Sequence, residues 1–123
     1  MSDRIYILDE IVVRQADRAT IASAYMKRYA PSARSRGMTL EGAWRTPPLD
    51  LPGREIALFY LWSVAGPAEW WGMRLGQARA NPELDVAIEG DEEKTRWWRW
   101  VDDRAISRKR RFMVDQPEAG GDV

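Results

Sequence analysis

Two segments that are apolar at both odd and even positions place the strongest constraint on what this chain can fold into. RIYILDEIVV (Arg4–Val13) carries charge inside the segment only at Asp9 and Glu10, and REIALFYLWSV (Arg54–Val64) is the most apolar stretch of the sequence. This pattern predicts strands that are covered on both faces. A chain of 123 residues buries one core but not two. One sheet face is therefore expected to remain bare and apolar, and such a face implies a partner.

Prolines, glycines and capping residues divide the rest of the sequence. A helix is expected to begin after Asp17 as N-cap, to be kinked or interrupted at Pro31, and to end at Gly37 as C-cap. Further strands are predicted at Met38–Thr46 and Ile106–Asp115, and further helices after Pro67 and from about Glu83 to Asp103. The order β-α-β-β-α-(α)-β indicates an α+β, ferredoxin-like plait. We expect one domain over residues 1–115, followed by a flexible tail over 116–123.

The sequence has neither cysteine nor histidine, and this limits its chemistry. Disulfides, thiolate nucleophiles, metals ligated by cysteine or histidine, and a Ser-His-Asp arrangement are excluded. No glycine-rich loop that could hold a phosphate occurs in the sequence. We therefore expect neither a metal nor a cofactor.

Charge and hydropathy bear on the partners and the location of the chain. The net charge is zero, from 19 basic and 19 acidic residues, although an acidic run over 83–93 and a basic run over 104–111 are present. Two solvated faces or a mutual ion-pair seam explain these runs better than nucleic-acid binding does. No apolar run approaches the roughly 20 residues of a membrane span, and the N-terminus, MSDRIYILDE, has no signal-peptide layout. We expect a cytoplasmic chain without a nucleic-acid or membrane partner.

A set of residues at spaced positions along the chain, most of them aromatic, glycine or proline, forms a recognisable pattern. These positions are Tyr6, Leu8, Tyr25, Tyr29, Pro31, Gly37, Gly42, Trp44, Trp62 and Ser63. From Ile5 to Val114 the pattern resembles the dimeric α+β-barrel superfamily and, within it, NIPSNAP-type domains. The resemblance implies a homodimer whose two sheets pack into a barrel. It also implies a pocket in each subunit between the sheet and the helices.

The superfamily includes cofactor-free monooxygenases, polyketide cyclases, muconolactone isomerases, haem-degrading enzymes and domains of unknown role, so the fold does not determine the function. Members that use a pocket histidine have no counterpart here, because the chain has no histidine. Trp62 matches a tryptophan that the monooxygenases place near the end of the third strand. The asparagine that they place four residues earlier is Leu58 in this chain, and this departure weakens the monooxygenase interpretation.

Two adjacent acids are the most informative polar residues. Asp9 and Glu10 lie in an otherwise apolar strand, so one is expected to point to each face of the sheet. A carboxylate held against apolar neighbours has a raised pKa, which suits a general acid or base near neutral pH. The alternative is that each acid pairs with an arginine at the dimer seam or at a strand end. Glu41 is a weaker candidate of the same kind and is expected to face solvent.

Tyr60 shares a strand face with Leu58 and Trp62, both candidates for ligand contact. The Tyr60 hydroxyl could donate a hydrogen bond to a substrate oxygen. The alternative is a core tyrosine whose hydroxyl bonds to a backbone carbonyl.

Further ligand-contact candidates surround the corner at Gly66-Pro67. Trp44, Trp62 and Trp71 could close three walls of one cavity, with packing in the core as the alternative. Arg74 could hold a carboxylate or an enolate, or be exposed, and Tyr25 completes the set of candidates. A second group of tryptophans, Trp97, Trp98 and Trp100, cannot all face one way on a helix, because neighbouring residues lie roughly 100° apart.

The leading hypothesis is a cofactor-independent enzyme that acts on a bulky hydrophobic or aromatic metabolite by proton transfer, as an isomerase, cyclase or lyase. Asp9 or Glu10 would be the base, and Tyr60 or Arg74 would stabilise the oxyanion. The alternative is a non-catalytic domain that binds a small molecule or dimerises. A cofactor-free monooxygenase is the third hypothesis.

Overall fold

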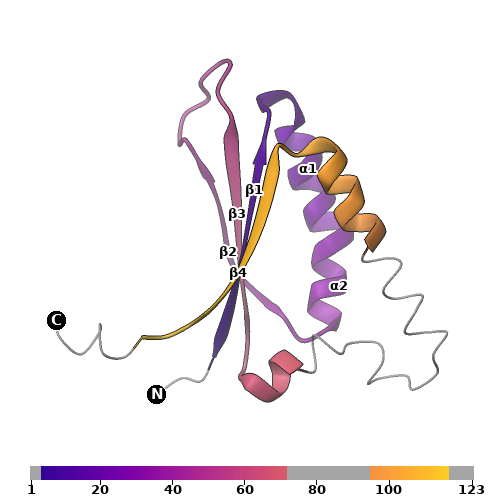
Figure 1. Ribbon diagram of the computed structural model, residues 1–123, viewed down its shortest axis with the longest axis vertical. Helices are drawn as coiled ribbons and strands as arrows, with labels where there is room; N and C mark the ends of the chain where they lie inside the picture. The colour runs from indigo at the N-terminus through magenta and orange to yellow at the C-terminus, as the bar shows by residue number, and fades with distance from the viewer. Residues whose placement is uncertain (1–3, 72–94, 117–123) are drawn as a thin grey trace.

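Four antiparallel strands form the sheet of the computed structural model, which describes residues 4–71 and 95–116. The strands are β1 (Ile5–Val13), β2 (Thr39–Thr46), β3 (Ile56–Val64) and β4 (Ser107–Val114), in the spatial order β2-β3-β1-β4 (Figure 1). The two strands predicted to be the most apolar, β1 and β3, therefore lie at the centre. This is the predicted ferredoxin-like α+β architecture.

The helices lie on one side of this sheet. A 3-10 turn (Gln15–Asp17) leads into α1 (Arg18–Ala24), a π-helical turn (Tyr25–Tyr29) and α2 (Ala30–Ser35). Residues 67–71 and 95–104 are also helical. Figure 1 shows α1, α2 and helix 95–104 on the same side of the sheet. The opposite side carries no helix of the part of the chain that the structure describes.

Three features of the first helix were predicted, and the structure modifies two of them. Asp17 stands before α1, but its side chain makes no capping hydrogen bond, because the 3-10 turn already gives its backbone helical angles. The expected interruption at Pro31 takes the form of the π turn, in which the Ala30 N–H bonds back to the Tyr25 carbonyl. Such a wide turn accommodates the proline ring without ending the helix.

Gly37 ends the helix as predicted. Its φ is +90°, a left-handed conformation in which glycine is favoured. The Gly37 N–H bonds to the Arg34 carbonyl and the Met38 N–H bonds to the Ala33 carbonyl, the pair of bonds of a Schellman motif.

Burial alternates along the two central strands and defines two faces. In β1 the odd positions from Ile7 to Val13 are buried, and in β3 the even positions from Ile56 to Val64 are buried against the helices. We call this the helix-covered face. The other face, which we call the bare face, carries Tyr6, Leu8, Glu10, Val12, Ala57, Phe59 and Leu61, all half-buried. It is apolar at most of these positions, as the sequence predicts.

A β-bulge in β2 changes the face on which Trp44 lies. Leu40 pairs with Trp62 on the helix-covered face, but after the irregularity between Leu40 and Gly42 it is Phe59 that pairs with Trp44. Leu40 and Trp44 therefore lie on opposite faces, whereas a regular strand over the predicted range Met38–Thr46 would place them on the same face. The extra residue, Glu41, shifts the alternation by one position, which moves every later side chain of β2 to the opposite face.

Several predictions fall on residues 72–94 or 117–123, outside the described residues. They concern Arg74, the acidic run over 83–93, most of the helix expected from about Glu83, and nearly all of the tail over 116–123. Among the described helices, none is both long enough and apolar enough to cross a membrane.

Candidate functional site

The candidate residues divide between the two faces of the sheet. Asp9, Tyr25, Leu58, Tyr60 and Trp62 lie on the helix-covered side and are buried. Glu10 and Trp44 lie on the bare face. The expectation that Asp9 and Glu10 point to opposite faces is confirmed, and so is the shared face of Leu58, Tyr60 and Trp62.

A buried ion pair between Asp9 and Arg110 forms the centre of the helix-covered side. Arg110 lies opposite Asp9 on the neighbouring strand β4, and its Nε and Nη2 atoms lie 2.6 and 2.8 Å from the two Asp9 carboxylate oxygens. Asp9 is only 2% exposed. Charge-assisted, two-pronged contacts of this kind are among the strongest hydrogen bonds in proteins.

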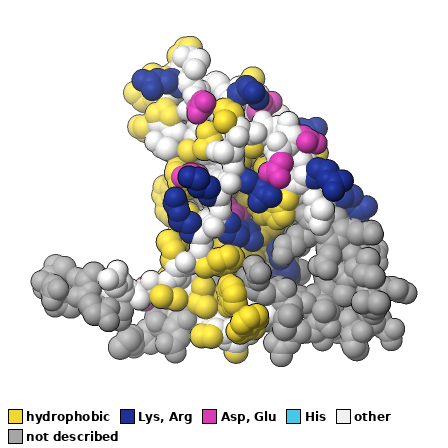
Figure 2. Space-filling view, viewed as in Figure 1, with side chains coloured by type: hydrophobic (Ala, Val, Ile, Leu, Met, Phe, Trp, Pro, Cys, Tyr) yellow, Lys and Arg dark blue, Asp and Glu magenta, His cyan; other side chains and the backbone are white. Residues whose placement is uncertain are grey.

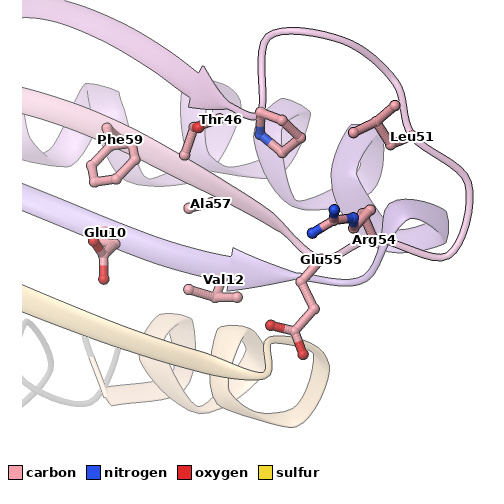
Figure 3. A pocket seen from close by; sticks show the side chains of 9 residues that line it. Glu10, Val12, Thr46, Leu51, Arg54, Glu55, Ala57 and Phe59 are labelled. Atoms are coloured by element: carbon pink, nitrogen blue, oxygen red, sulfur yellow. The ribbon is translucent and has the colours of Figure 1, made fainter.

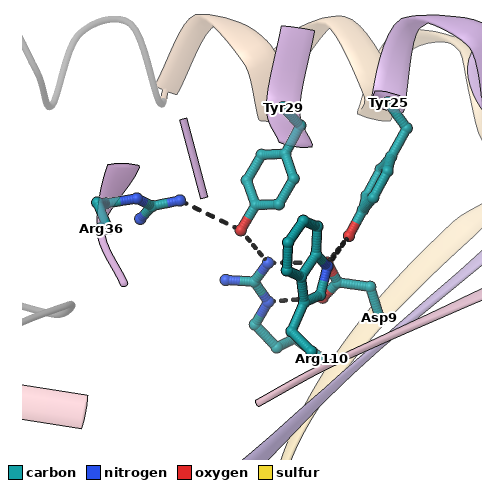
Figure 4. A network of polar contacts seen from close by, with 6 residues as sticks. Asp9, Tyr25, Tyr29, Arg36 and Arg110 are labelled. Atoms are coloured by element: carbon teal, nitrogen blue, oxygen red, sulfur yellow. Dashed lines mark hydrogen bonds and ion pairs between the residues drawn. The ribbon is translucent and has the colours of Figure 1, made fainter. Parts of the chain in front are cut away.

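Two aromatic side chains extend this network into the helix layer and across the sheet. The Tyr25 hydroxyl donates to Asp9 Oδ2 at 2.7 Å, and the Trp62 indole nitrogen donates to the Tyr25 oxygen at 2.6 Å (Figure 4). Burial raises the pKa of Tyr25, and the negative charge of Asp9 raises it further. Tyr25 therefore stays protonated and acts as a donor to Asp9.

Arg110 keeps its positive charge in this setting. Burial lowers the pKa of Arg110, but its hydrogen bonds to Asp9 and the charge of Asp9 raise that pKa by more, so the net shift is upward. The basic run over 104–111 was expected to form a solvated face or an ion-pair seam. Figure 2 shows dark-blue basic side chains at several separate places on the visible face, with acidic side chains nearby. Arg110, by contrast, is largely buried, and its side chain is 19% exposed.

Tyr29 connects Arg110 to a second guanidinium. The Arg110 Nη2 atom donates to the Tyr29 hydroxyl at 2.5 Å, and the Arg36 Nη2 atom donates to the same oxygen at 3.3 Å. Figure 4 shows the two arginine side chains reaching this hydroxyl from different sides. Arg36, at the end of α2, also bonds to the Ser32 carbonyl.

Tyr60 is buried beside the network but does not belong to it. Its ring stacks on the ring of Tyr25, with 3.7 Å between centroids. Burial raises the pKa of Tyr60 to about 12. Its hydroxyl is therefore protonated at neutral pH. It is available as a donor, because it makes no hydrogen bond with residues 4–71 or 95–116.

The second group of tryptophans divides by burial, as the helical geometry requires. Trp97 is buried in the core, and Trp98 and Trp100 are half-buried. Arginine side chains cover these rings: Arg28 lies over Trp97 and Trp100, Arg104 over Trp100, and Arg108 and Arg110 over Trp98. The rings form a boundary between the core and a basic surface.

A groove of about 490 Å³ lies on the bare face, at the end of the sheet next to the loop between β2 and β3 (Figure 3). Its lining is Glu10, Val12, Thr46, Pro47, Leu51, Arg54, Glu55, Ala57 and Phe59. The volume is within the usual range for small-molecule sites. Glu10 therefore lies on the opposite side of the sheet from Tyr60 and Trp62, with which it was predicted to form one site.

The expected tryptophan-walled cavity does not form as predicted among the described residues. Trp44 is 57% exposed on the bare face, with its ring lying across Gly42, and Trp71 is 56% exposed. Trp62 alone of these three is buried on the helix-covered face. Trp71 instead contacts Trp70, with 4.9 Å between ring centroids.

Three residues of this network were not among the predicted site residues: Tyr29, Arg36 and Arg110. A partial signal existed for Arg110: the last strand is rich in arginine on both faces, so an arginine was available to pair with a buried acid of β1. Only the observed register identifies Arg110 as that partner. Glu41 was expected to face solvent, and it is exposed, but it accepts a hydrogen bond from the buried Ser63 hydroxyl. Within the described ranges, no group of three or more acidic side chains could hold a metal ion.

Replacement of Asp9 is predicted to destabilise the fold far more than replacement of its neighbour. Asp9→Asn leaves the charge of Arg110 buried and unpaired, which costs about 3–5 kcal/mol in the free energy of unfolding. Glu10 lies opposite Lys109 but forms no ion pair among the described residues, so Glu10→Gln should change stability by no more than about 0.5 kcal/mol. Urea denaturation of both variants tests this difference, and equal effects would contradict the assignment of the ion pair.

Comparison with known proteins gives matches in structure only. No family model and no curated protein matches the sequence. A NIPSNAP family protein from Agrobacterium tumefaciens is 14% identical, with 94% of this chain and 89% of the other covered and a TM-score of 0.61. A NIPSNAP domain protein from Burkholderia xenovorans is 10% identical, with 91% and 94% covered and a TM-score of 0.59.

A further NIPSNAP family protein from Agrobacterium tumefaciens, whose function is unknown, is 10% identical, with 89% of this chain and 86% of the other covered and a TM-score of 0.56. Identities this low support the fold and nothing finer. Together with the strand order and the helices on one face, they establish that this chain has a ferredoxin-like α+β fold similar to that of these NIPSNAP proteins.

Proposed function

We propose that this chain is a homodimeric domain that binds a bulky apolar or aromatic small molecule on the helix-covered face of its sheet. The observation that carries the proposal is the Tyr60 hydroxyl. Tyr60 is only 4% exposed, its ring is held against Tyr25, and its hydroxyl has no hydrogen-bond partner among the described residues. Its hydroxyl oxygen is not one of the fully buried polar atoms that lack a partner, so the hydroxyl can be reached from outside the core and can donate to an incoming acceptor. A ligand that carries a carbonyl oxygen would satisfy it.

The contacts of Asp9 favour binding over catalysis by this residue. Both of its oxygens accept hydrogen bonds, from Arg110 and Tyr25, and it is almost fully buried. A general base must reach the proton that it removes. Asp9 could do so only after releasing Tyr25, whose raised pKa keeps its own proton in place.

We expect Tyr60→Phe to remove the preference for a ligand with an oxygen acceptor. Two matched probes are 2-acetylnaphthalene, which has a carbonyl, and 2-ethylnaphthalene, which has none. The parent protein should bind the ketone more tightly by about 1 kcal/mol, roughly fivefold, and Tyr60→Phe should bind both equally. Quenching of tryptophan fluorescence measures the affinities.

The control for this comparison is Tyr6→Phe, the same change on the bare face. It should leave the preference for the ketone intact. If Tyr60→Phe keeps that preference, or if neither probe binds, the proposed site is wrong.

The homodimer is proposed from the bare face, which is apolar at the centre of the sheet. Phe59 lies in the central strand β3, and Trp44 of β2 pairs with it. Two copies that pack these faces together would remove both from water. Other small domains with one bare apolar sheet face meet the same requirement by association.

Phe59→Glu is predicted to convert the dimer into a folded monomer, because it would bury a charge in the proposed interface. Analytical ultracentrifugation measures the mass, and circular dichroism confirms that the variant is folded. Leu49→Glu, on an exposed loop, is the control and should remain dimeric. A monomeric parent protein, or a dimeric Phe59→Glu variant, would refute this part of the proposal.

Cofactor-independent proton transfer on the same class of ligand is the second candidate. The observation that favours it is that Asp9 and Tyr60 are direct partners across β1 and β3, so an acid and a free hydroxyl donor lie side by side on the helix-covered face. In this reaction Asp9 would remove a proton next to the carbonyl, and Tyr60 would stabilise the enolate oxygen.

Deuterium exchange tests this second candidate without knowledge of the natural substrate. In heavy water, the protein should accelerate exchange of the methyl protons of 2-acetylnaphthalene, which are acidified by the carbonyl. Asp9→Asn should abolish the acceleration, whereas Glu10→Gln, on the opposite face, should not. Exchange at the rate of buffer alone would leave binding as the only function at this site.

A further inference from the structure

Two arginine guanidinium groups contact the hydroxyl of Tyr29. It accepts hydrogen bonds from Arg110 Nη2 and Arg36 Nη2, and Tyr29 is only 3% exposed. Because these two bonds occupy the oxygen as an acceptor, its own hydrogen must be donated elsewhere. Among the described residues, the Tyr29 hydroxyl donates no hydrogen bond.

Several guanidinium hydrogens around this point are also without partners. Arg110 uses Nε and Nη2 for Asp9 and Tyr29, which leaves its Nη1 group without a partner in the described ranges. Arg36 uses Nε for the Ser32 carbonyl and one bond from Nη2 for Tyr29. A guanidinium carries five N–H donors. Donors remain on both arginines, and Arg36 is only half-buried, so an incoming group can reach it.

The charges of the cluster do not cancel. Asp9 neutralises Arg110, but no carboxylate of the described residues forms an ion pair with Arg36. Arg36 also lies over the Tyr29 ring, with 5.7 Å to its centroid. The next arginine along β4 on this face, Arg108, is already paired with Asp102. The cluster of Asp9, Arg36 and Arg110 therefore carries one excess positive charge.

We propose that Tyr29, Arg36 and Arg110 form a subsite for a carboxylate group of the ligand, so that the molecule bound by this domain is an apolar or aromatic acid. This inference rests on the proposed function, because it concerns the ligand of the same helix-covered face. A carboxylate supplies acceptors for the Tyr29 hydrogen and for the guanidinium forks. Its single charge matches the single excess charge of the cluster, whereas a phosphate monoester carries about −1.5 to −2.

Asp9 has a positioning role in this subsite. Its two hydrogen bonds fix the Arg110 guanidinium in one plane, and Arg110 in turn fixes the Tyr29 hydroxyl. A donor held in place before binding loses less entropy when the ligand arrives.

The test uses four small probes on the full chain at constant ionic strength: acetate, benzoate, benzamide and inorganic phosphate. NMR signals of the arginine Nε–H groups report on the subsite. Acetate and benzoate should shift the Arg36 and Arg110 signals with saturation, and benzoate should bind at least tenfold more tightly than benzamide. Inorganic phosphate should bind more weakly than benzoate.

Variants separate this subsite from general attraction to a basic surface. Arg36→Gln and Tyr29→Phe should each weaken benzoate binding at least tenfold. Arg34→Gln, an exposed position on the same helix, is the matched control and should bind benzoate as the parent protein does. Equal losses in Arg34→Gln and Arg36→Gln would overturn the subsite.

The outcomes distinguish the subsite from the proposed function. If benzamide binds as tightly as benzoate and acetate gives no saturable shift, the subsite is wrong while the aromatic site stands. If acetate binds in an Arg36-dependent way but neither benzamide nor the naphthalene probes bind, the anion subsite stands and the proposed aromatic site is wrong. Tighter binding of phosphate than of benzoate would overturn the assignment to a carboxylate.

Discussion

The ion pair of Asp9 and Arg110 joins the parts of this fold that are far apart in sequence. It connects the central strand β1 to the edge strand β4, and through Tyr25 and Tyr29 it ties both strands to the helix above them. Removing two charges from water is costly, and the contact repays that cost only when the remaining hydrogen-bonding groups are satisfied. Here Tyr25 satisfies the carboxylate, and Tyr29 accepts a further bond from the guanidinium. The position of the helix and the placement of the strands thus depend on one another.

The parts of the structure that could be predicted from the sequence are those whose cause lies within a few neighbouring residues. Alternation along the strands gave the opposite directions of Asp9 and Glu10, and the shared face of Leu58 and Trp62, because side-chain direction in a strand depends only on position. The cap at Gly37 was predictable because a left-handed residue ends many helices and glycine is favoured there. These features are local, so a short window of sequence contains their cause.

The features that were missed depend on contacts outside such a window. The bulge at Glu41 adds one residue to β2 and reverses the face of Trp44. The neighbouring Gly42 is favoured at bulges, but a glycine alone does not determine the register of the strand pair. Asp9 and Arg110 are 101 positions apart, and their contact exists only once β1 and β4 are paired in one register. An acid that looked like a free base in a single strand is, in the assembled sheet, the partner of a buried cation.

The division of candidates between two faces also changes what each acid can do. Glu10, beside a groove on the bare face, would be enclosed if a second copy covered that face, and its chemistry would then depend on the partner. Asp9, on the helix-covered face, has its oxygens committed to Arg110 and Tyr25 and can influence a ligand mainly through them. The negative charge of the buried Asp9 holds the Arg110 guanidinium in place and keeps the Tyr25 hydroxyl protonated. Its net effect is therefore to supply this face with hydrogen-bond donors. A site built in this way favours a ligand rich in acceptor oxygens, and the aromatic rings around it favour one that is otherwise apolar.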